Sequence, residues 1–268
     1  MSTKSDGTQF ANVEGTENPG AFVTFLDARA GIEGERQIKE LELAMLELKP
    51  GHHVLDLGCG TGDDAREIGA LVGPKGKVVG LDVSPTMIAE ARKRALSTDL
   101  PVKFIEGDAL NLPFPSESFD RVRTDRVLVH LRKPGKALAE MVRVTRVGGR
   151  VVVSELDFGT QFLDSPHRET TRKAFTSFAE RAASGWIGGA LPRMLRETGL
   201  SDVECEPRVI RPSLKFLHRI MDGHLESPEV VNQFGDGELA TWWQSLAAAE
   251  AAGHFHNGVT IFTAKGQK

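Results

Sequence analysis

Two patterns of apolar and polar positions alternate along the first 157 residues. Between Glu35 and Leu48, apolar side chains recur every three or four residues, as they do on one face of a helix. The next segment, 52–57, ends in a short apolar run before a glycine-rich turn, which is typical of a buried strand. Further helical stretches follow at 65–73, 84–96 and 138–145, and further strand-like runs at 76–83, 102–109, 119–125 and 150–157.

Strands that alternate with helices are normally joined by right-handed crossovers into a parallel sheet. We therefore predict an α/β fold with a doubly wound, mostly parallel, seven-stranded Rossmann-like sheet. The helix at 84–96 has the clearest start, because Ser84 is a good N-cap and Pro85 suits the first helical position.

The alternation breaks after Asp157, where long helical stretches replace simple crossovers. Strand patterns return at 201–210 and 258–266. The predicted organisation is a disordered arm (1–18), an N-terminal helical cap (19–50), a Rossmann-like core (51–157), a helical lid insert (158–190), a return to the core (191–210), a second lid insert (211–257), and a final core strand with a tail (258–268). We expect the inserts to form one lid over the carboxyl ends of the strands, where open α/β sheets bind ligands.

Composition narrows the classes of partner. The chain has 268 residues and a net charge of -4, so it lacks the basic footprint of a nucleic-acid-binding protein. It contains no apolar run of the roughly 18 residues expected of a membrane span, and its start does not resemble a signal peptide. Cys59 and Cys205 form no disulfide framework and no zinc motif. We expect a cytoplasmic protein with a small-molecule substrate, and leave a homodimer open.

The stretch VLDLGCGTGDD, from Val54 to Asp64, indicates the type of ligand. It resembles a dinucleotide fingerprint, but Asp63 replaces the last glycine. Asp56, Asp63 and Asp64 would all repel a pyrophosphate, although Asp63 and Asp64 also suit the first turn of a helix. A cationic cofactor without phosphate fits this turn better. S-adenosylmethionine, with its sulfonium and ammonium groups, has those properties.

Two further acids end the following strands. Asp82 lies 20 residues beyond Gly62, where a carboxylate can accept hydrogen bonds from ribose hydroxyls. Val83 and Met87 follow and are placed to enclose an adenine ring. Asp108 ends the third strand, where its carboxylate can accept from the adenine amino group.

On these motifs the chain resembles the class I S-adenosylmethionine-dependent methyltransferases. It is most similar to the branch with quinone C-methyltransferases and small-molecule natural-product methyltransferases. The segments that carry the resemblance, within 54–153, are VLDLGCGTG, VVGLDVSPTMIAEAR, FIEGDALNLPFPSESFD and LAEMVRVTRVGGRVVV. The resemblance implies cofactor contacts at Asp56, Gly58, Gly60, Asp82, Val83, Asp108 and Ala109, and a backbone contact near Thr124.

The chain departs from that branch at two places. Val147 stands where proline is usual, which changes a turn and not the chemistry. Phe22 and Phe25 occupy the N-terminal helix where the branch often has a tyrosine for the methionine carboxylate, and this chain contains no tyrosine. We expect Arg29 to take that role.

Candidate substrate and catalytic residues follow the fourth and fifth strands. Asp125, Arg126 and His130 should lie near the transferred methyl group, and His130 is the best candidate for a general base. A hydrogen-bonded structural role for His130 stays open. Glu155 and Asp157 either orient or deprotonate the substrate, or tie down the lid.

Residues of the inserts carry weaker predictions. Aromatic side chains at helical spacing usually belong to a core, but we expect one or two of those in the inserts to touch substrate. We select Trp186 as the substrate contact. The other aromatic candidates are Phe175, Phe178, Trp242 and Trp243. His254 and His256 form at most half of a metal site, so no metal is expected. Cys59 is expected to be a small buried filler and not a nucleophile.

We therefore predict methyl transfer from S-adenosylmethionine to a carbon, nitrogen or oxygen of a small aromatic or apolar molecule, as in secondary metabolite biosynthesis. Four alternatives stay open. They are a quinone-type C-methyltransferase, a non-catalytic S-adenosylmethionine-binding protein, an enzyme that couples methylation to cyclisation, and an NAD-dependent oxidoreductase.

Overall fold

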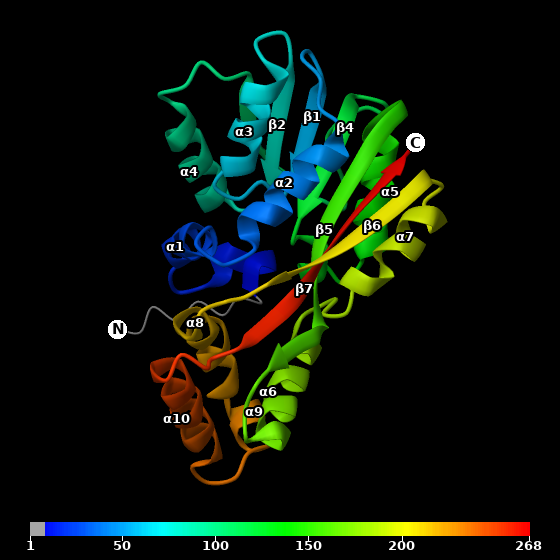
Figure 1. Cartoon of the computed structure of the whole chain (residues 1–268). Helices are drawn as coiled ribbons and strands as arrows, with labels where there is room; N and C mark the ends of the chain where they lie inside the picture. The colour runs from blue at the N-terminus through cyan, green and yellow to red at the C-terminus, as the bar shows by residue number, and fades with distance from the viewer. Residues whose placement is uncertain (1–8) are drawn as a thin grey trace.

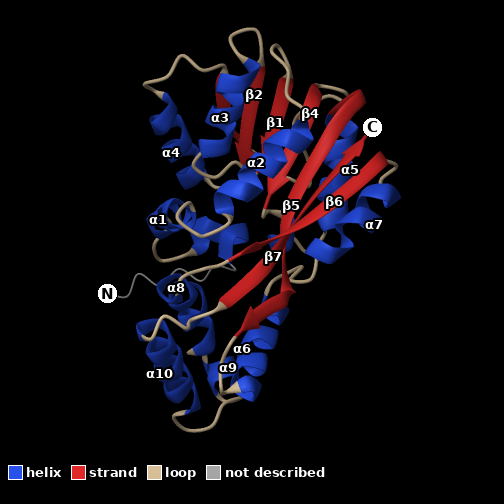
Figure 2. Ribbon diagram, in the orientation of Figure 1, coloured by secondary structure: helices blue, strands red, loops and turns tan. Residues whose placement is uncertain are grey.

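A computed structural model describes residues 9–268, which form one seven-stranded sheet with helices on both faces (Figures 1 and 2). The strands are β1 (His53–Leu57), β2 (Lys77–Asp82), β3 (Val102–Glu106), β4 (Phe119–Asp125), β5 (Thr145–Leu163), β6 (Ser201–Ile210) and β7 (Asn257–Gln267). Their order is β3-β2-β1-β4-β5-β7-β6, and β7 alone is antiparallel to its neighbours. The predicted fold class is confirmed.

Alternation along the strands sends apolar side chains into two cores. Val54 of β1 faces α2 (Glu35–Leu46), α3 (Asp63–Val72) and α4 (Pro85–Ala95), whereas Leu55 faces α5 (Pro134–Val144) and α7 (Leu191–Glu197). The same inside-outside alternation places Asp56 on the α2 and α3 face. The sheet is therefore buried on both sides, as expected of parallel strands.

Local signals explain where two helices begin and end. The Ser84 hydroxyl accepts a hydrogen bond from the Met87 amide at 3.2 Å, and Pro85 opens α4, as predicted. Helix α2 ends at Leu46, two residues before the apolar pattern does, because Glu47 adopts a left-handed conformation with φ of 46°.

Strand β5 is longer than predicted. The expected strand ended at Asp157 and was followed by a helical insert, but β5 continues to Leu163. Its extension pairs with β7 through Phe162 opposite Gly258 and Leu163 opposite Asn257, after an irregularity that begins at Asp157. The backbone groups of the extension form hydrogen bonds with a strand nearly one hundred residues away. Local periodicity in the sequence does not reveal such a distant pairing.

The long strands lead into a cluster of four helices, α6 (Arg168–Arg181), α8 (Leu214–Leu225), α9 (Pro228–Val231) and α10 (Glu238–Ala251). Figure 1 shows this cluster beyond the end of the sheet where β5 finishes. Helices from both predicted inserts share one apolar core that includes Phe178, Leu217 and Trp242. The Trp242 indole donates to the Thr171 hydroxyl at 3.0 Å, which satisfies its one polar group.

The N-terminal segment differs from the expected disordered arm. Residues 1–8 lie outside the described part, but Gln9–Gly15 form the 3-10 helix η1, followed by α1 (Gly20–Arg29). Val13 is buried, and the Glu14 carboxylate accepts from the Ser84 hydroxyl at 2.6 Å and from the Thr86 amide at 3.1 Å. These contacts hold η1 against the start of α4. Within residues 9–268, no helix has the length and apolarity needed to cross a bilayer.

The buried Glu155 carboxylate fixes the segment that follows β4. It accepts hydrogen bonds from the amides of Val127 (2.9 Å), Leu128 (2.6 Å) and Val129 (3.2 Å), at the start of the 3-10 helix η2 (Leu128–His130). A second short helix, η3 (Gly188–Ala190), precedes α7. Burial raises the pKa of Glu155 to about 8 in spite of these donors.

Removing this carboxyl group should destabilise the fold. We expect Glu155→Ala to lower the free energy of unfolding by about 3 kcal/mol, because three interior amides lose their acceptor. Glu155→Gln, which keeps one acceptor oxygen, should cost less than half as much. Urea unfolding of the three proteins provides the measurement.

The pH dependence of the same comparison follows from the raised pKa. The contribution of the protonated carboxyl is fully present below its ordinary pKa and is lost as pH rises through about 8. The stability advantage of the wild type over Glu155→Gln should therefore shrink between pH 5 and 8. An advantage that grows with pH would contradict the assignment.

Candidate functional site

A cavity of about 700 Å³ lies at the carboxyl ends of β1, β2 and β4 and extends under the lid. Turns of the core line one end, α1 and η1 contribute a wall, and lid helices α6 and α8 close the other end. The cavity thus joins a region rich in carboxylates to a region lined by apolar side chains. This division suits a charged cofactor beside an apolar acceptor.

The turn after β1 requires glycine at two cavity-lining positions. Gly58 and Gly60 have φ of 70° and 52°, in the left-handed region. A Cβ on Gly58 would lie 2.1 Å from a methyl carbon of Val127, and one on Gly60 would lie 2.8 Å from Leu26. Glycine therefore lets the turn adopt left-handed backbone angles and pack against Val127 and Leu26 beside the cavity.

Asp82 is held beside this turn by backbone amides. Its carboxylate accepts from Gly60 at 2.9 Å and from Ser84 at 2.9 Å, and burial raises its pKa. The predicted neighbours Val83, Met87, Asp108 and Ala109 line the same cavity. Asp108 stays exposed, with one oxygen accepting from the Leu110 amide at 2.8 Å. The acidic strand ends predicted for the cofactor are thus brought together.

Asp56 lies deeper, within a buried ion network on the α2 and α3 side of the sheet. The Arg123 guanidinium of β4 donates to Asp56 at 3.0 Å, to Asp64 at 2.8 Å and to Glu42 at 2.6 Å. The second Asp56 oxygen is buried and has no hydrogen-bond partner within the described chain. Burial raises the pKa of Asp56 to about 7, although Arg123 acts in the opposite direction.

Asp125 and Arg126 belong to the same network and also line the cavity, so their role as substrate ligands stays a prediction. Asp125 accepts from Lys39 at 2.6 Å and from Arg126 at 2.7 Å, and Arg126 also binds Glu35 at 3.0 Å. Both side chains are buried in these pairs, so their charges are already compensated. Arg29, predicted to hold the methionine carboxylate, donates to Asp125 at 3.3 Å and remains partly exposed along the cavity.

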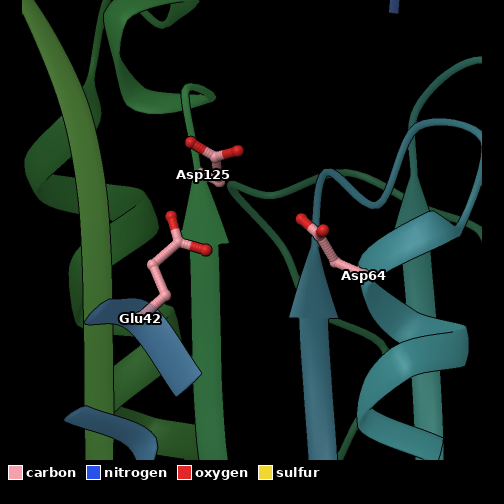
Figure 3. Close-up of side chains that lie close together, drawn as sticks. All are labelled: Glu42, Asp64 and Asp125. Atoms are coloured by element: carbon pink, nitrogen blue, oxygen red, sulfur yellow. The ribbon is translucent and has the colours of Figure 1, made fainter. Parts of the chain in front are cut away.

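Figure 3 shows Glu42, Asp64 and Asp125 converging from α2, α3 and β4. Their oxygen atoms lie within 4.8 Å of one another, close enough to hold a metal ion. The Lys39 ammonium, however, lies 2.6 Å from Asp125 and 3.7 Å from Glu42, and the Arg123 guanidinium contacts Glu42 and Asp64. Positive charge is therefore already supplied by side chains. His254 and His256 are both exposed.

His130 lines the cavity as predicted. It ends η2, and its ring lies 5.5 Å from the ring of Phe10. Phe10 in turn packs edge-on against Phe22 at 4.9 Å, so η1 forms part of the wall beside His130. Sequence reasoning missed Phe10 and Glu14, because the surrounding residues are polar and show no helical period.

Two predicted catalytic residues lie outside the wall of the cavity. Glu155 supports η2 and does not line the cavity, and neither does Asp157, whose carboxylate accepts from Gly159 at 3.0 Å and Gly189 at 2.9 Å. These two hydrogen bonds agree with the predicted alternative in which Asp157 holds the lid in place. The Thr124 hydroxyl donates to the Leu57 carbonyl at 2.9 Å, whereas the predicted cofactor contact concerns the Thr124 backbone and stays a prediction.

Trp186, the lid aromatic chosen as a substrate contact, does not line the main cavity, whereas two of the other four do. Trp186 is half exposed, packs over Gly159 and lines a separate shallow hollow. Phe175 and Phe178 line the main cavity, together with Phe158 and Phe216. Cys59 is the expected inert filler, because burial raises the pKa of its thiol well above the usual range.

Comparisons with known proteins agree with this geometry. A family model described as a methyltransferase domain matches residues 48–199. An uncharacterized 37.1 kDa protein in transposon TN4556 of Streptomyces fradiae is 38% identical over 181 residues, 67% of this chain and 52% of that protein. The ubiquinone/menaquinone biosynthesis C-methyltransferase UbiE of Ectopseudomonas mendocina is 37% identical over 119 residues, 44% of this chain and 46% of its own length.

The chain thus spans about half the length of the curated relatives it matches. Among solved structures, phosphoethanolamine N-methyltransferase 2 of Haemonchus contortus, in complex with S-adenosyl-L-methionine, is similar over 100% of this chain and 60% of that one. Its TM-score is 0.63 and its identity 19%, a likeness of fold. The dinucleotide alternative finds no support in these matches. The chain belongs to the class I S-adenosylmethionine-dependent methyltransferases, and S-adenosylmethionine is its cofactor.

Proposed function

We propose that this methyltransferase acts on a small, uncharged aromatic or apolar molecule of the kind found in secondary metabolism. The observation that carries the proposal is the lid end of the cavity, where the lining side chains are uncharged. They include Phe158, Phe175, Phe178, Phe216, Leu217 and Ile220. A charged acceptor would lose its hydration there without gaining an ionic partner.

The core end of the cavity supplies the groups that hold the cofactor. Asp82 and Asp108 are placed to accept hydrogen bonds from ribose and adenine, and the unpartnered oxygen of Asp56 can accept from the ammonium. Bound S-adenosylmethionine supplies a methyl group with a good leaving group. The chain's own contribution is alignment of the acceptor and exclusion of water by η1 and the lid.

His130 is the proposed general base for acceptors that must lose a proton. It lies on the cavity wall beside Phe10 and follows the loop after β4 that Glu155 holds in place. A phenol or an activated carbon acid would need this base. An acceptor that already has a free lone pair would not.

The similarity to UbiE favours a second candidate, methylation of a quinol ring. A quinol is also an uncharged aromatic molecule and suits the same apolar wall. The matched segment covers 44% of the chain. We therefore keep quinol methylation as one member of the proposed substrate class.

A panel of acceptors tests the proposed function. We expect the full chain with S-adenosylmethionine to add 14 Da per methyl to indole or 1,4-naphthohydroquinone, as detected by mass spectrometry. Phosphoethanolamine, which is small and charged, should gain no methyl group. Methylation of phosphoethanolamine with none of the aromatic acceptors would contradict the proposal.

Substitution of His130 tests the base. With an acceptor that loses a proton, His130→Gln should lower kcat about 100-fold or more while cofactor affinity stays unchanged. The acidic limb of the pH-rate profile should also disappear. His52→Gln, in the turn before β1, is the matched control and should behave as wild type. Equal rates for both variants would leave His130 a structural residue only.

Cofactor binding should depend on pH through Asp56. A cation bound beside Asp56 favours the ionised carboxylate, whose pKa is raised to about 7 without it. Affinity should therefore rise about tenfold between pH 5.5 and 7.5, with protons released on binding, and Asp56→Asn should remove most of this change. Calorimetry in buffers of different ionisation enthalpy measures both effects. A flat profile in the wild type would argue against an ionic contact.

A further inference from the structure

The lid end of the cavity contains very few polar side chains. Its lining residues from β5, β7 and the lid helices are uncharged, and most are phenylalanine, leucine, isoleucine or valine. The two with hydrogen-bonding side chains are Gln161 of β5 and Asn257 of β7. A polar group in such a setting fixes the orientation of a ligand more than it adds affinity.

Gln161 is the more informative of the two. Its Oε1 atom is buried and meets no hydrogen-bond donor within residues 9–268. The shallow hollow on the other side of Gln161 adds no partner for this oxygen. A buried amide oxygen without a donor destabilises the protein on its own.

Toward the cavity the neighbours of Gln161 are apolar, whereas the hollow that it also lines contains Arg168, Thr171 and Arg172. Phe158, Phe162 and Phe175 line both the cavity and the hollow beside Gln161. A leucine or methionine would fill this wall without leaving a polar atom unsatisfied. Rotation about the last side-chain bond of glutamine is soft, so Oε1 can turn toward the cavity when a donor is present there.

Gln161 also lies further along β5 than the residues beside the carboxyl end of β4. Ser154 pairs with Asp125 at the end of β4, and Gln161 follows seven residues later on the extension of β5 toward the lid. A ligand group that reaches Gln161 is therefore at the end of the acceptor remote from the transferred methyl. The recognised group and the methylated atom are different parts of the molecule.

We propose that Gln161 is a specificity-determining residue that accepts a hydrogen bond from a hydroxyl or N–H group on the remote end of an otherwise apolar, uncharged acceptor. This inference rests on the proposed function, since it assigns the lid end of the cavity to the acceptor. The protein should then bind a ligand that has a hydrogen-bond donor at this end more tightly than a ligand of similar shape that lacks the donor.

Three naphthalene probes test the inference by calorimetry on the full chain saturated with S-adenosylhomocysteine. 2-Naphthol has a donor, 2-methoxynaphthalene lacks it, and 2-naphthoate is charged. In the wild type, 2-naphthol should bind about tenfold more tightly than 2-methoxynaphthalene, the effect of one net hydrogen bond. 2-Naphthoate should bind more weakly than both.

Gln161→Leu should lose this discrimination, with weaker binding of 2-naphthol and unchanged binding of 2-methoxynaphthalene. Gln233→Leu, an exposed glutamine at the end of α9, is the matched control and should keep it. Unchanged affinity for S-adenosylhomocysteine shows that the variants are folded.

Different results would overturn the role of Gln161 and the assignment of the cofactor. Discrimination that persists in Gln161→Leu, or failure of 2-naphthol to bind the cofactor-loaded protein, would overturn the inference alone. Tight binding of 2-naphthoate would contradict the uncharged substrate class of the proposed function as well. Failure of the wild type to bind S-adenosylhomocysteine would instead contradict the cofactor assignment on which the proposed function depends.

Discussion

The buried guanidinium of Arg123 joins three elements that form the floor of the site. Its contacts to Glu42, Asp56 and Asp64 connect α2, β1 and α3 beneath the glycine turn. Removing one partner of such a buried group typically costs about 3–5 kcal/mol, because the remaining charges stay desolvated. The turn and the carboxylates around it are therefore held in place by ion pairs as well as by apolar packing.

The same network has more carboxyl groups than cations. It contains five of the former, Glu35, Glu42, Asp56, Asp64 and Asp125, and four of the latter, Arg29, Lys39, Arg123 and Arg126. Asp56 and Glu42 each keep one oxygen that has no hydrogen-bond partner among residues 9–268, and burial raises the pKa of both. Asp56 can thus accept one positive charge, and this is the position that we propose for the ammonium group of the cofactor. This accounts for carboxylates around a turn of the kind that elsewhere holds phosphate.

Local sequence signals were sufficient for the core of the fold and the cofactor end of the site. The glycine turn follows β1, Asp82 ends β2 and Asp108 lies two residues beyond the end of β3, so their convergence follows from a parallel sheet. The ion-pair partners of individual charged side chains could not be predicted from the sequence. Arg126 binds Glu35, 91 residues away, and no local pattern distinguishes that pair from a substrate contact. The extension of β5 likewise depends on pairing with β7, and it moves Phe158 and Gln161 onto the cavity wall while Trp186 lies outside it.

The most direct measurement is a calorimetric titration of the full chain with S-adenosylmethionine, S-adenosylhomocysteine and NAD, repeated with Asp82→Asn. The charge arrangement predicts one equivalent of each adenosyl cofactor bound, about 100-fold weaker binding in Asp82→Asn, and no binding of NAD. The exposed Asp99→Asn change serves as the control and should bind like the wild type. Binding of NAD without binding of either adenosyl cofactor would contradict the account.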